Sequence, residues 1–520
     1  MSELRWRAGD PRVRSVVEDW WDDPECPEHR ACVLRDNPRR RLVRIDSRSA
    51  GTLVVKHYRA GSGRHPARER WKAWLGRSPA DREFRTLARL REAGLPVPPP
   101  LARATVAGGD RLIVTRFVAG ETWSQGLAAC PRSRRQALAA LGSVLAGLHQ
   151  RGWLHGDLHG GNLLATPGGP VLLDLQHARR SHRRRGRARD LARLEHWLWA
   201  AGVPLSDRVR TRAAALRLAR PFDGRARREL GRVGRAVRGR FHEHAESRHR
   251  RARRPGRRSA RLELEGHRGL RLRTIEAAEV AEAFTAHRQA LARNDDRVLK
   301  DDGRSRVTAV RAGAHRIVVK EVLPRGAWRW LSDVVRGSAG RRAWSGGHGL
   351  AARSLGAATP LAYLERRSFG LPSASLVFLE DLGPAEPADA IAGDPRRLTE
   401  TVAALGALAA RLHTRGADHG DLKASHVYLD PAGGPPRLLD LEGVRFGRRV
   451  SARRRMRALA QLNASLPDRF PDEARLAAFT RYARRLPFGA RRGARARALR
   501  RIVALSRARQ HRWTGGRCPL

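Results

Sequence analysis

Two short segments, HGDLHGGNLL (155–164) and HGDLKASHVYL (419–429), decide how this chain folds. They share the tetrapeptide His-Gly-Asp-Leu at an offset of 264 residues. Further matches extend outward in the same order: LHQRG (148–152) with LHTRG (412–416), VVK (54–56) with VVK (318–320), and LLDL (172–175) with LLDL (438–441). Because a series of ordered matches indicates an internal duplication, we predict two copies of one domain.

The pattern around these matches is the same in both halves. Alternating apolar residues predict strands, followed by a helix, further strands and a long amphipathic helix. The expected ranges in the first half are 41–45, 52–56, 80–93, 111–117 and 133–151, and those in the second are 306–310, 316–320, 341–354, 375–379 and 396–415.

A small β-rich lobe followed by a larger helical lobe is the order of elements in a protein kinase. We therefore predict an α+β fold of two tandem bilobal protein-kinase-like domains. The first domain is expected at 1–246 and the second at 267–520. The basic run between them (247–266) reads as a solvated linker, with binding to an anionic surface as the alternative.

The lysines indicate where nucleotide phosphates would bind. Only five of the 105 basic residues are lysine, yet Lys56 and Lys320 both end an apolar strand, each 101 residues before the aspartate of its His-Gly-Asp segment. A compact ammonium at that position binds the α- and β-phosphates in kinases. Glu83, in the helix that follows, is positioned to pair with Lys56.

The His-Gly-Asp segment of the first half resembles a kinase catalytic loop. Phosphoryl transfer needs a group that orients the acceptor hydroxyl and oxygen ligands for a metal. Asp157 is the candidate catalytic base, and His155 would support the loop. Asn162, five residues after Asp157, and Asp174, which follows two leucines, are the candidate Mg²⁺ ligands.

The second half keeps most of this set. Asp421 is its candidate base, and Asp440 its candidate metal ligand. His426 stands at the place of Asn162 and is the other candidate metal ligand, and His419 and Lys423 would support the loop.

Two parts are missing from the pattern. No glutamate stands in the second half at the place of Glu83, where Ser345 or Trp344 falls. Neither half has a G-x-G-x-x-G segment before its lysine strand, so the phosphates must be covered by a less regular turn. We accordingly expect turnover in the first half, whose set is complete.

Charge and cysteine content bound the partners and the compartment. The net charge of +54 attracts polyanions, but arginine is scattered through every segment, which does not favour a dedicated nucleic-acid surface. Four cysteines are too few for a disulfide framework. The amino-terminal residues lack an apolar signal region, and no apolar run reaches the length of a membrane span. These features predict a cytoplasmic protein, with peripheral contact at the anionic inner face of the inner membrane as an open alternative.

The second half resembles the bacterial lipopolysaccharide kinase family. The resemblance lies in residues 419–429, in LLDLEGVRF (438–446) and in AQLNASL (460–466), and it covers most of 267–520. In that family a histidine often stands where other kinases have asparagine, as His426 does here. The first half resembles the wider kinase-like superfamily through 155–164 and 172–175.

This resemblance implies an ATP- and Mg²⁺-dependent kinase. Its acceptor would be a hydroxyl on a Kdo or heptose sugar of lipopolysaccharide core, or on a related envelope glycolipid. A Ser/Thr protein kinase and a pseudokinase pair that serves as a binding scaffold are the two alternatives.

Overall fold

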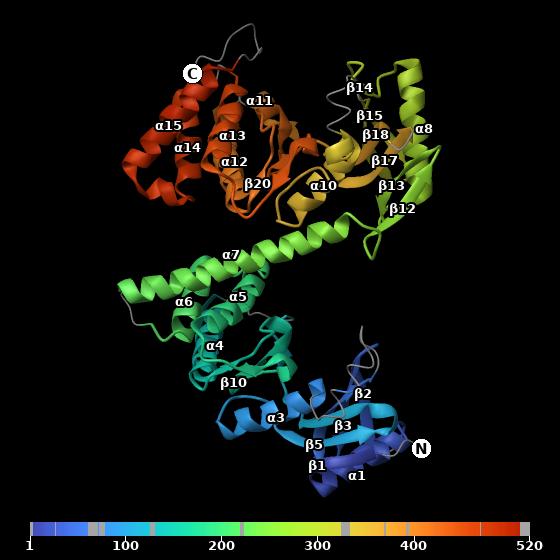
Figure 1. Ribbon diagram of the computed structural model, residues 1–520, viewed down its shortest axis with the longest axis vertical. Helices are drawn as coiled ribbons and strands as arrows, with labels where there is room; N and C mark the ends of the chain where they lie inside the picture. Colours follow the sequence, from blue (N-terminus) through green and yellow to red (C-terminus); the bar gives the residue numbers. More distant parts are fainter. Residues whose placement is uncertain are drawn as a thin grey trace. The chain divides into compact units, whose positions relative to one another are not determined.

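A computed structural model of the chain describes residues 4–26, 28–60, 71, 78–124, 131–218, 223–323, 333–368, 371–391, 395–467 and 470–509. The chain forms two compact units, Met1–Phe241 and His242–Leu520 (Figure 1). Each unit begins with an antiparallel sheet and continues into a mainly helical part. The predicted α+β fold of two kinase-like domains in tandem is therefore confirmed.

The first unit opens with a six-stranded sheet in the order β1-β5-β6-β4-β3-β2. Its strands are β1 (Leu4–Gly9), β2 (His29–Asn37), β3 (Arg40–Ser47), β4 (Gly51–Tyr58), β5 (Pro100–Val106) and β6 (Arg111–Arg116), with helices α1 (Pro11–Asp22) and α3 (Pro79–Glu92). Strands β3 and β4 bury alternate residues, and Val43, Ile45, Leu53 and Val55 pack with α1 in one core. Because side chains alternate along a strand, Lys56 faces the side opposite to Val55.

The helical part of the first unit positions the His-Gly-Asp loop. It contains β7 (Glu121–Thr122), α4 (Pro131–Gln150), β8 (Trp153–Leu154), η2 (Gly160–Asn162), β9 (Leu163–Thr166), β10 (Gly169–Leu172), η3 (Leu175–His177), β11 (Arg179–Arg180), α5 (Arg184–Ala200) and α6 (Leu205–Ala215). Leu158 of the loop is fully buried in the same apolar cluster as Leu148 of α4 and Leu194 of α5. The loop is thus anchored between two helices.

The second unit repeats this plan with a seven-stranded sheet in the order β12-β13-β17-β18-β16-β15-β14. The strands are β12 (Ser259–Leu264), β13 (His267–Leu272), β14 (Val298–Asp301), β15 (Ser305–Ala312), β16 (His315–Val322), β17 (Pro360–Ser368) and β18 (Leu371–Glu380), with helices α8 (Ala277–Arg293) and α10 (Ala339–Ala351). Lys320 lies on β16, which pairs with β15 and β18 as β4 pairs with β3 and β6.

The helical part of the second unit surrounds the second His-Gly-Asp loop. Its elements are β19 (Glu386–Pro387), α11 (Ala388–Ile391), α12 (Pro395–Thr414), β20 (Ala417–Asp418), η4 (Ala424–His426), β21 (Val427–Leu429), β22 (Arg437–Leu438), η5 (Leu441–Gly443), β23 (Arg445–Phe446), α13 (Ala452–Ala464), α14 (Asp472–Ala483), η6 (Pro487–Ala490) and α15 (Arg492–Arg507). Figure 1 shows α12 to α15 grouped together in this part of the unit. In the described portion of the chain, no helix combines the length and apolar character that crossing a membrane requires.

The residues expected to form a solvated linker are largely ordered. Helix α7 (Gly224–Ala252) contains the division between the two units and covers the start of the run, and β12 covers its end. His249, Ser259 and Leu262 are buried. The basic composition describes only the exposed side of these elements, so the linker prediction is wrong for the helical and strand residues. A bend at 253–258 separates them.

Candidate active sites

The lysine of the first unit has the predicted partner. Lys56 Nζ lies 2.5 Å from Glu83 Oε1, and Glu83 in α3 is fully buried. The Tyr58 hydroxyl donates to the other carboxylate oxygen, Oε2. Both oxygens of Glu83 therefore have donors, and the ammonium is held at the surface of β4 that faces α3.

Asp174 has a partner that the sequence did not reveal. It adopts a left-handed backbone conformation (φ 55°), and both its oxygens accept from the Arg40 guanidinium at 3.1 Å. Burial opposes ionisation of Asp174, but the hydrogen bonds and charge of Arg40 outweigh it and hold the carboxyl pKa below its usual value. Arg40 begins β3, directly after the turn that joins it to β2. Because the chain has 100 arginines, no feature of the sequence distinguished Arg40 as a partner of Asp174.

The catalytic loop is held by a residue that sequence reasoning missed. Asp190 of α5 is buried and accepts from the main-chain N–H groups of His155 and Gly156, both at 2.9 Å, and lies 3.2 Å from His149 Nε2. Asp190 is one of only two acidic residues in the arginine-rich helix α5, and this was the available signal. Burial lowers the pKa of His155, so its imidazole is neutral, and its Nδ1 accepts from the Asp157 N–H at 3.4 Å.

The candidate base Asp157 and the candidate metal ligand Asn162 lie along this loop, whereas Asp174 comes after β10. The Asp157 side chain is 43% exposed, and its Oδ2 is 3.7 Å from His159 Nε2. Hydrogen bonding with His159 lowers the pKa of Asp157, so the carboxylate is ionised at neutral pH. Asn162 Nδ2 donates to the Asp157 carbonyl at 2.9 Å, which leaves its Oδ1 as an oxygen donor. One amide oxygen and the Asp174 carboxylate form a donor set suited to Mg²⁺.

The second unit supplies the lysine partner from a different element. Lys320 Nζ lies 2.7 Å from Asp440 Oδ1 and 2.6 Å from Glu442 Oε1. Ser345, at the expected place of the missing glutamate, bonds instead to His249, and Trp344 donates to the Ala252 carbonyl. Lys320 is therefore not unpaired, which corrects one reason for favouring the first unit.

Helix α10 packs closely against η5, the element that supplies the carboxylate. A Cβ atom on Gly346 of α10 would clash with the Leu441 carbonyl oxygen, and one on Gly347 would clash with Pro360. Helix α10 thus touches the backbone of η5. Counted from the capping serines of the two helices, Ser78 and Ser338, the place of Glu83 in α3 corresponds to the buried Ala343 in α10, which carries no carboxylate. Glu442, two residues after Asp440, takes over the pairing.

Three groups of the second unit could hold a metal ion. Asp421, His426 and Asp440 each offer a ligand atom, and these atoms lie within 4.8 Å of one another. His426 Nδ1 lies 2.9 Å from the Asp421 carbonyl, the same contact that Asn162 makes in the first unit. Donation through Nδ1 leaves Nε2 as the ligand atom. A nitrogen suits Mg²⁺ less well than the amide oxygen of Asn162.

The base and loop residues of the second unit are also in contact. Gln461 of α13 donates to Asp421 Oδ1, and Lys423 Nζ lies 3.0 Å from Asp421 Oδ2. His419 is buried and its Nε2 lies 2.8 Å from the Leu439 carbonyl. Asp440 repeats the left-handed conformation of Asp174 (φ 54°). Burial opposes its ionisation, but the charge and hydrogen bond of Lys320 keep its pKa below the usual value.

Comparison with known proteins places both units in one family. The family described as "Lipopolysaccharide kinase (Kdo/WaaP) family" matches residues 25–215 and 332–482. A 3-deoxy-D-manno-octulosonic acid kinase of Xylella fastidiosa strain M12 is 32% identical over 194 residues, which cover 35% of this chain and 75% of that protein. The kinase of the same name from strain 9a5c is 31% identical over 194 residues, with the same coverage.

A solved structure, titled "WaaP in complex with acyl carrier protein", is also similar. It shares 20% sequence identity at a TM-score of 0.32 and covers 42% of this chain and 91% of that chain.

Proposed function

Because this chain belongs to the lipopolysaccharide kinase (Kdo/WaaP) family, we propose that it transfers the γ-phosphoryl group of Mg²⁺-ATP to a sugar hydroxyl of lipopolysaccharide core. The chain is a kinase, and its relatives of known name act on 3-deoxy-D-manno-octulosonic acid. That sugar, or a heptose beside it, is the proposed acceptor. The observation that carries the proposal is the recurrence, in both units, of a strand lysine that is paired to a buried or half-buried glutamate and whose charge acts on the candidate metal-binding aspartate, Asp174 or Asp440.

Each candidate site residue of the first unit has a distinct role in the proposed reaction. Lys56, held by Glu83, binds the α- and β-phosphates. Asp157 orients the acceptor hydroxyl and takes its proton as the bond to the γ-phosphorus forms and the bond to the ADP oxygen breaks. Asn162 and Asp174 would hold Mg²⁺, which neutralises phosphate charge when bound.

Arg40 takes the place of a glycine-rich loop in this proposal. It stands where β2 turns into β3 and is only 13% exposed, with both its terminal nitrogens on Asp174. A metal at Asp174 must share or displace this guanidinium, which then lies beside the incoming phosphates. Bidentate phosphate binding by arginine supplies what glycine N–H groups supply elsewhere.

We assign turnover to the first unit, but on one of the two reasons that the sequence suggested. The unpaired state of Lys320 is no longer a reason, since Glu442 holds it. The metal ligands still differ, because Asn162 offers oxygen where His426 offers nitrogen.

The decisive experiment measures transfer of labelled γ-phosphate to a purified Kdo-bearing lipid acceptor and, separately, to a generic protein. Asp157→Asn is expected to lower transfer to the lipid about a hundredfold or more, as for loss of a general base, and Asp421→Asn much less. Transfer to protein alone would indicate a Ser/Thr kinase, and nucleotide binding without any turnover would indicate a scaffold. Full activity in Asp157→Asn with none in Asp421→Asn would assign the reaction to the second unit.

We also propose peripheral association with the anionic inner face of the inner membrane, supported by the net charge of +54. Binding to vesicles that contain anionic lipid should weaken steeply from low to high salt because surface charges are screened. Salt-independent co-sedimentation would contradict this localisation.

A further inference from the structure

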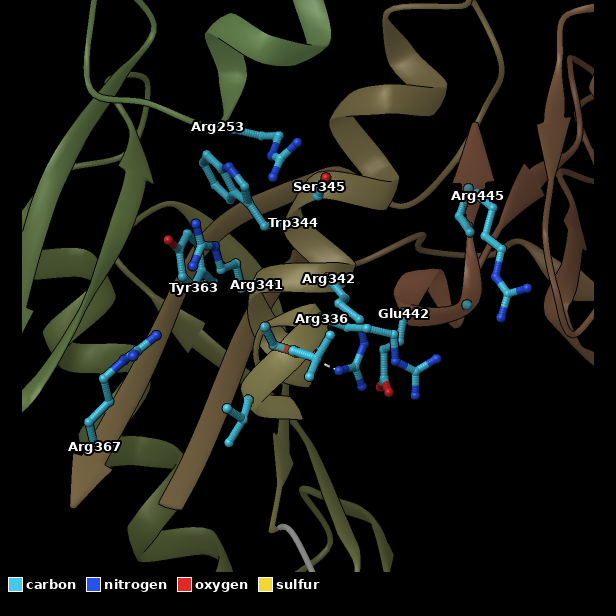
Figure 2. A pocket seen from close by; sticks show the side chains of 15 residues that line it. Arg253, Arg336, Arg341, Arg342, Trp344, Ser345, Tyr363, Arg367, Glu442 and Arg445 are labelled. Carbon is cyan, nitrogen blue, oxygen red and sulfur yellow. Dashed lines mark hydrogen bonds between the residues drawn. The ribbon is translucent and has the colours of Figure 1, made fainter. Parts of the chain in front are cut away.

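The second unit contains a cavity of about 400 Å³ that is rich in arginine (Figure 2). Its walls come from Arg253 after α7, from residues between 334 and 345 before and within α10, from strand β17, and from η5 with β23. Six of its fifteen lining residues are arginine: Arg253, Arg336, Arg341, Arg342, Arg367 and Arg445. The whole chain has 100 arginines in 520 residues, so the concentration here is about twice the background. The general arginine bias does not account for it.

The positive charge of this arginine pocket is only partly balanced. Arg342 lies 2.5 Å from Asp333, and Arg367 lies 2.8 Å from Glu365. Glu442 is the one acidic residue of the lining, and Lys320 already pairs with it.

Three of the other arginines in the lining have no acidic partner among the residues that the structure describes. Within the described part of the chain, Arg253, Arg341 and Arg445 form no salt bridge to an acidic side chain. Guanidinium groups gathered around a cavity repel one another unless an anion lies among them. The pocket therefore favours a ligand with several negative charges.

A rigid aromatic floor supports these charges. Trp344 and Tyr363 are buried, with ring centroids 5.6 Å apart. The Trp344 indole N–H is held by the Ala252 carbonyl at 2.9 Å. Figure 2 shows Arg253 beside Trp344 and Arg341 beside Tyr363. The site is thus built on ordered side chains.

The pocket is separate from the nucleotide-binding group but adjoins it. Lys320, Asp421 and Asp440 are not among its lining residues, whereas Glu442 and the three residues after it are. A ligand in the pocket therefore touches the segment that begins two residues after Asp440. Through Glu442 that segment holds Lys320.

We propose that the arginine pocket binds an anion carrying two or more phosphate or carboxylate groups, and that occupancy orders η5 and β23. Arginine forks bind phosphate and carboxylate oxygens in pairs. A phosphorylated lipid headgroup and a soluble phosphate ester share this chemistry. Binding of the anion does not depend on the proposed kinase reaction. Only an effect on nucleotide binding, passed through Glu442 to Lys320, would rest on that proposed function.

The test uses the full-length protein in nucleotide-free, Mg²⁺-free buffer, with inorganic tripolyphosphate as the probe. Because the chain is strongly basic, titration calorimetry is run at 0.3 M salt, well above physiological ionic strength, to suppress diffuse binding. Arg253→Gln with Arg341→Gln should weaken the affinity at least tenfold. The matched control, Arg497→Gln with Arg501→Gln, removes the same charge from the exposed face of α15 and should change the affinity less than twofold.

Equal weakening in both double variants would show that only net charge acts, and would overturn the proposal, as would unchanged affinity in the pocket variant. A second readout is hydrogen exchange over 438–446, which tripolyphosphate should slow in the wild type but not in the pocket variant. Unchanged exchange in the wild type would refute the ordering of η5 and β23.

A competition experiment distinguishes the two sources of ligand. If vesicles with 20% phosphatidylglycerol displace tripolyphosphate from the wild type and from the α15 control variant, but not from the pocket variant, the ligand is a lipid headgroup. If tripolyphosphate binds and vesicles do not displace it, the ligand is a soluble phosphate ester. Failure of both probes to bind would overturn the proposal.

Discussion

The pair formed by Lys56 and Glu83 makes a quantitative prediction about the first unit. Its atoms are 2.5 Å apart, and the side chains are 12% and 0% exposed. Removing one partner of a buried pair leaves the other charge without compensation, which costs about 3–5 kcal/mol of folding free energy. Removing both charges together leaves no such penalty, so the double variant should be more stable than the two single losses predict.

The structure also predicts an asymmetry between the single variants. Lys56→Met leaves a fully buried carboxylate whose remaining donor is Tyr58, and should cost about 3–5 kcal/mol. Glu83→Gln keeps an acceptor for Tyr58 and leaves an ammonium that is slightly exposed and whose charge already acts on Asp174, so its cost should be smaller, about 2–3 kcal/mol. The double variant is expected to recover at least about 2 kcal/mol of the summed loss.

Local measurement is needed because a chain of two units need not unfold in one step. Native-state hydrogen exchange of peptides from β4 and α3 gives the free energy of opening for this region. Thermal unfolding should show the first unit shifted downward by about 6–12 °C for a loss of 3 kcal/mol in a domain of this size. Lys300→Met is the matched control, since Lys300 and Asp302 are about half exposed, and it should leave the transition unchanged.

Two results would refute this reasoning. Additive losses in the double variant would mean that the carboxylate and the ammonium do not interact in solution. A loss for Lys56→Met no larger than that for Lys300→Met would mean that the charge of Glu83 is solvated or protonated.

Two further predictions concern the loop and pH. Asp190→Asn places an amide N–H₂ group against one of the two main-chain N–H donors that hold the catalytic loop. We expect kcat to fall at least tenfold, while the KM for ATP changes little. An equal change in kcat and KM would show that Asp190 does not act through the loop. Burial, with the charge of Arg455, lowers the pKa of His413 to about 3, so below about pH 6.5 the unfolded chain takes up a proton that the folded chain excludes. Unfolding free energy should therefore fall by about 1.4 kcal/mol per pH unit from this group as pH drops from 6.5, and urea unfolding at pH 7.5 and 5.5 should show a shallower decline in His413→Gln. An identical decline in that variant would mean that His413 is protonated in the fold.

The amino-acid sequence by itself determined the duplication, the order of the lobes and the main polar groups of each unit. Lys56 with Glu83, and Asn162 at the catalytic loop, could be found because a strand, helix or loop of standard length sets their spacing. These spacings depend on local secondary structure, which the pattern of nearby residues predicts. The linker prediction failed because it rested on the overall composition of residues 247–266. Only a few positions of the helix and the strand in this range are buried, so the exposed basic residues dominate the composition.

Tertiary structure alone decided which distant residues meet. Arg40 and Asp174 are 134 residues apart, and Lys320 and Asp440 are 120 apart, so no local pattern marks either contact. Glu442 takes the place of a helix glutamate as the partner of Lys320, and it comes from η5, an element that packs against α10 but is distant from Lys320 in the sequence. The arginine pocket is the extreme case, because in a chain this rich in arginine only the folding of four separate segments around one cavity distinguishes its six guanidiniums from the rest.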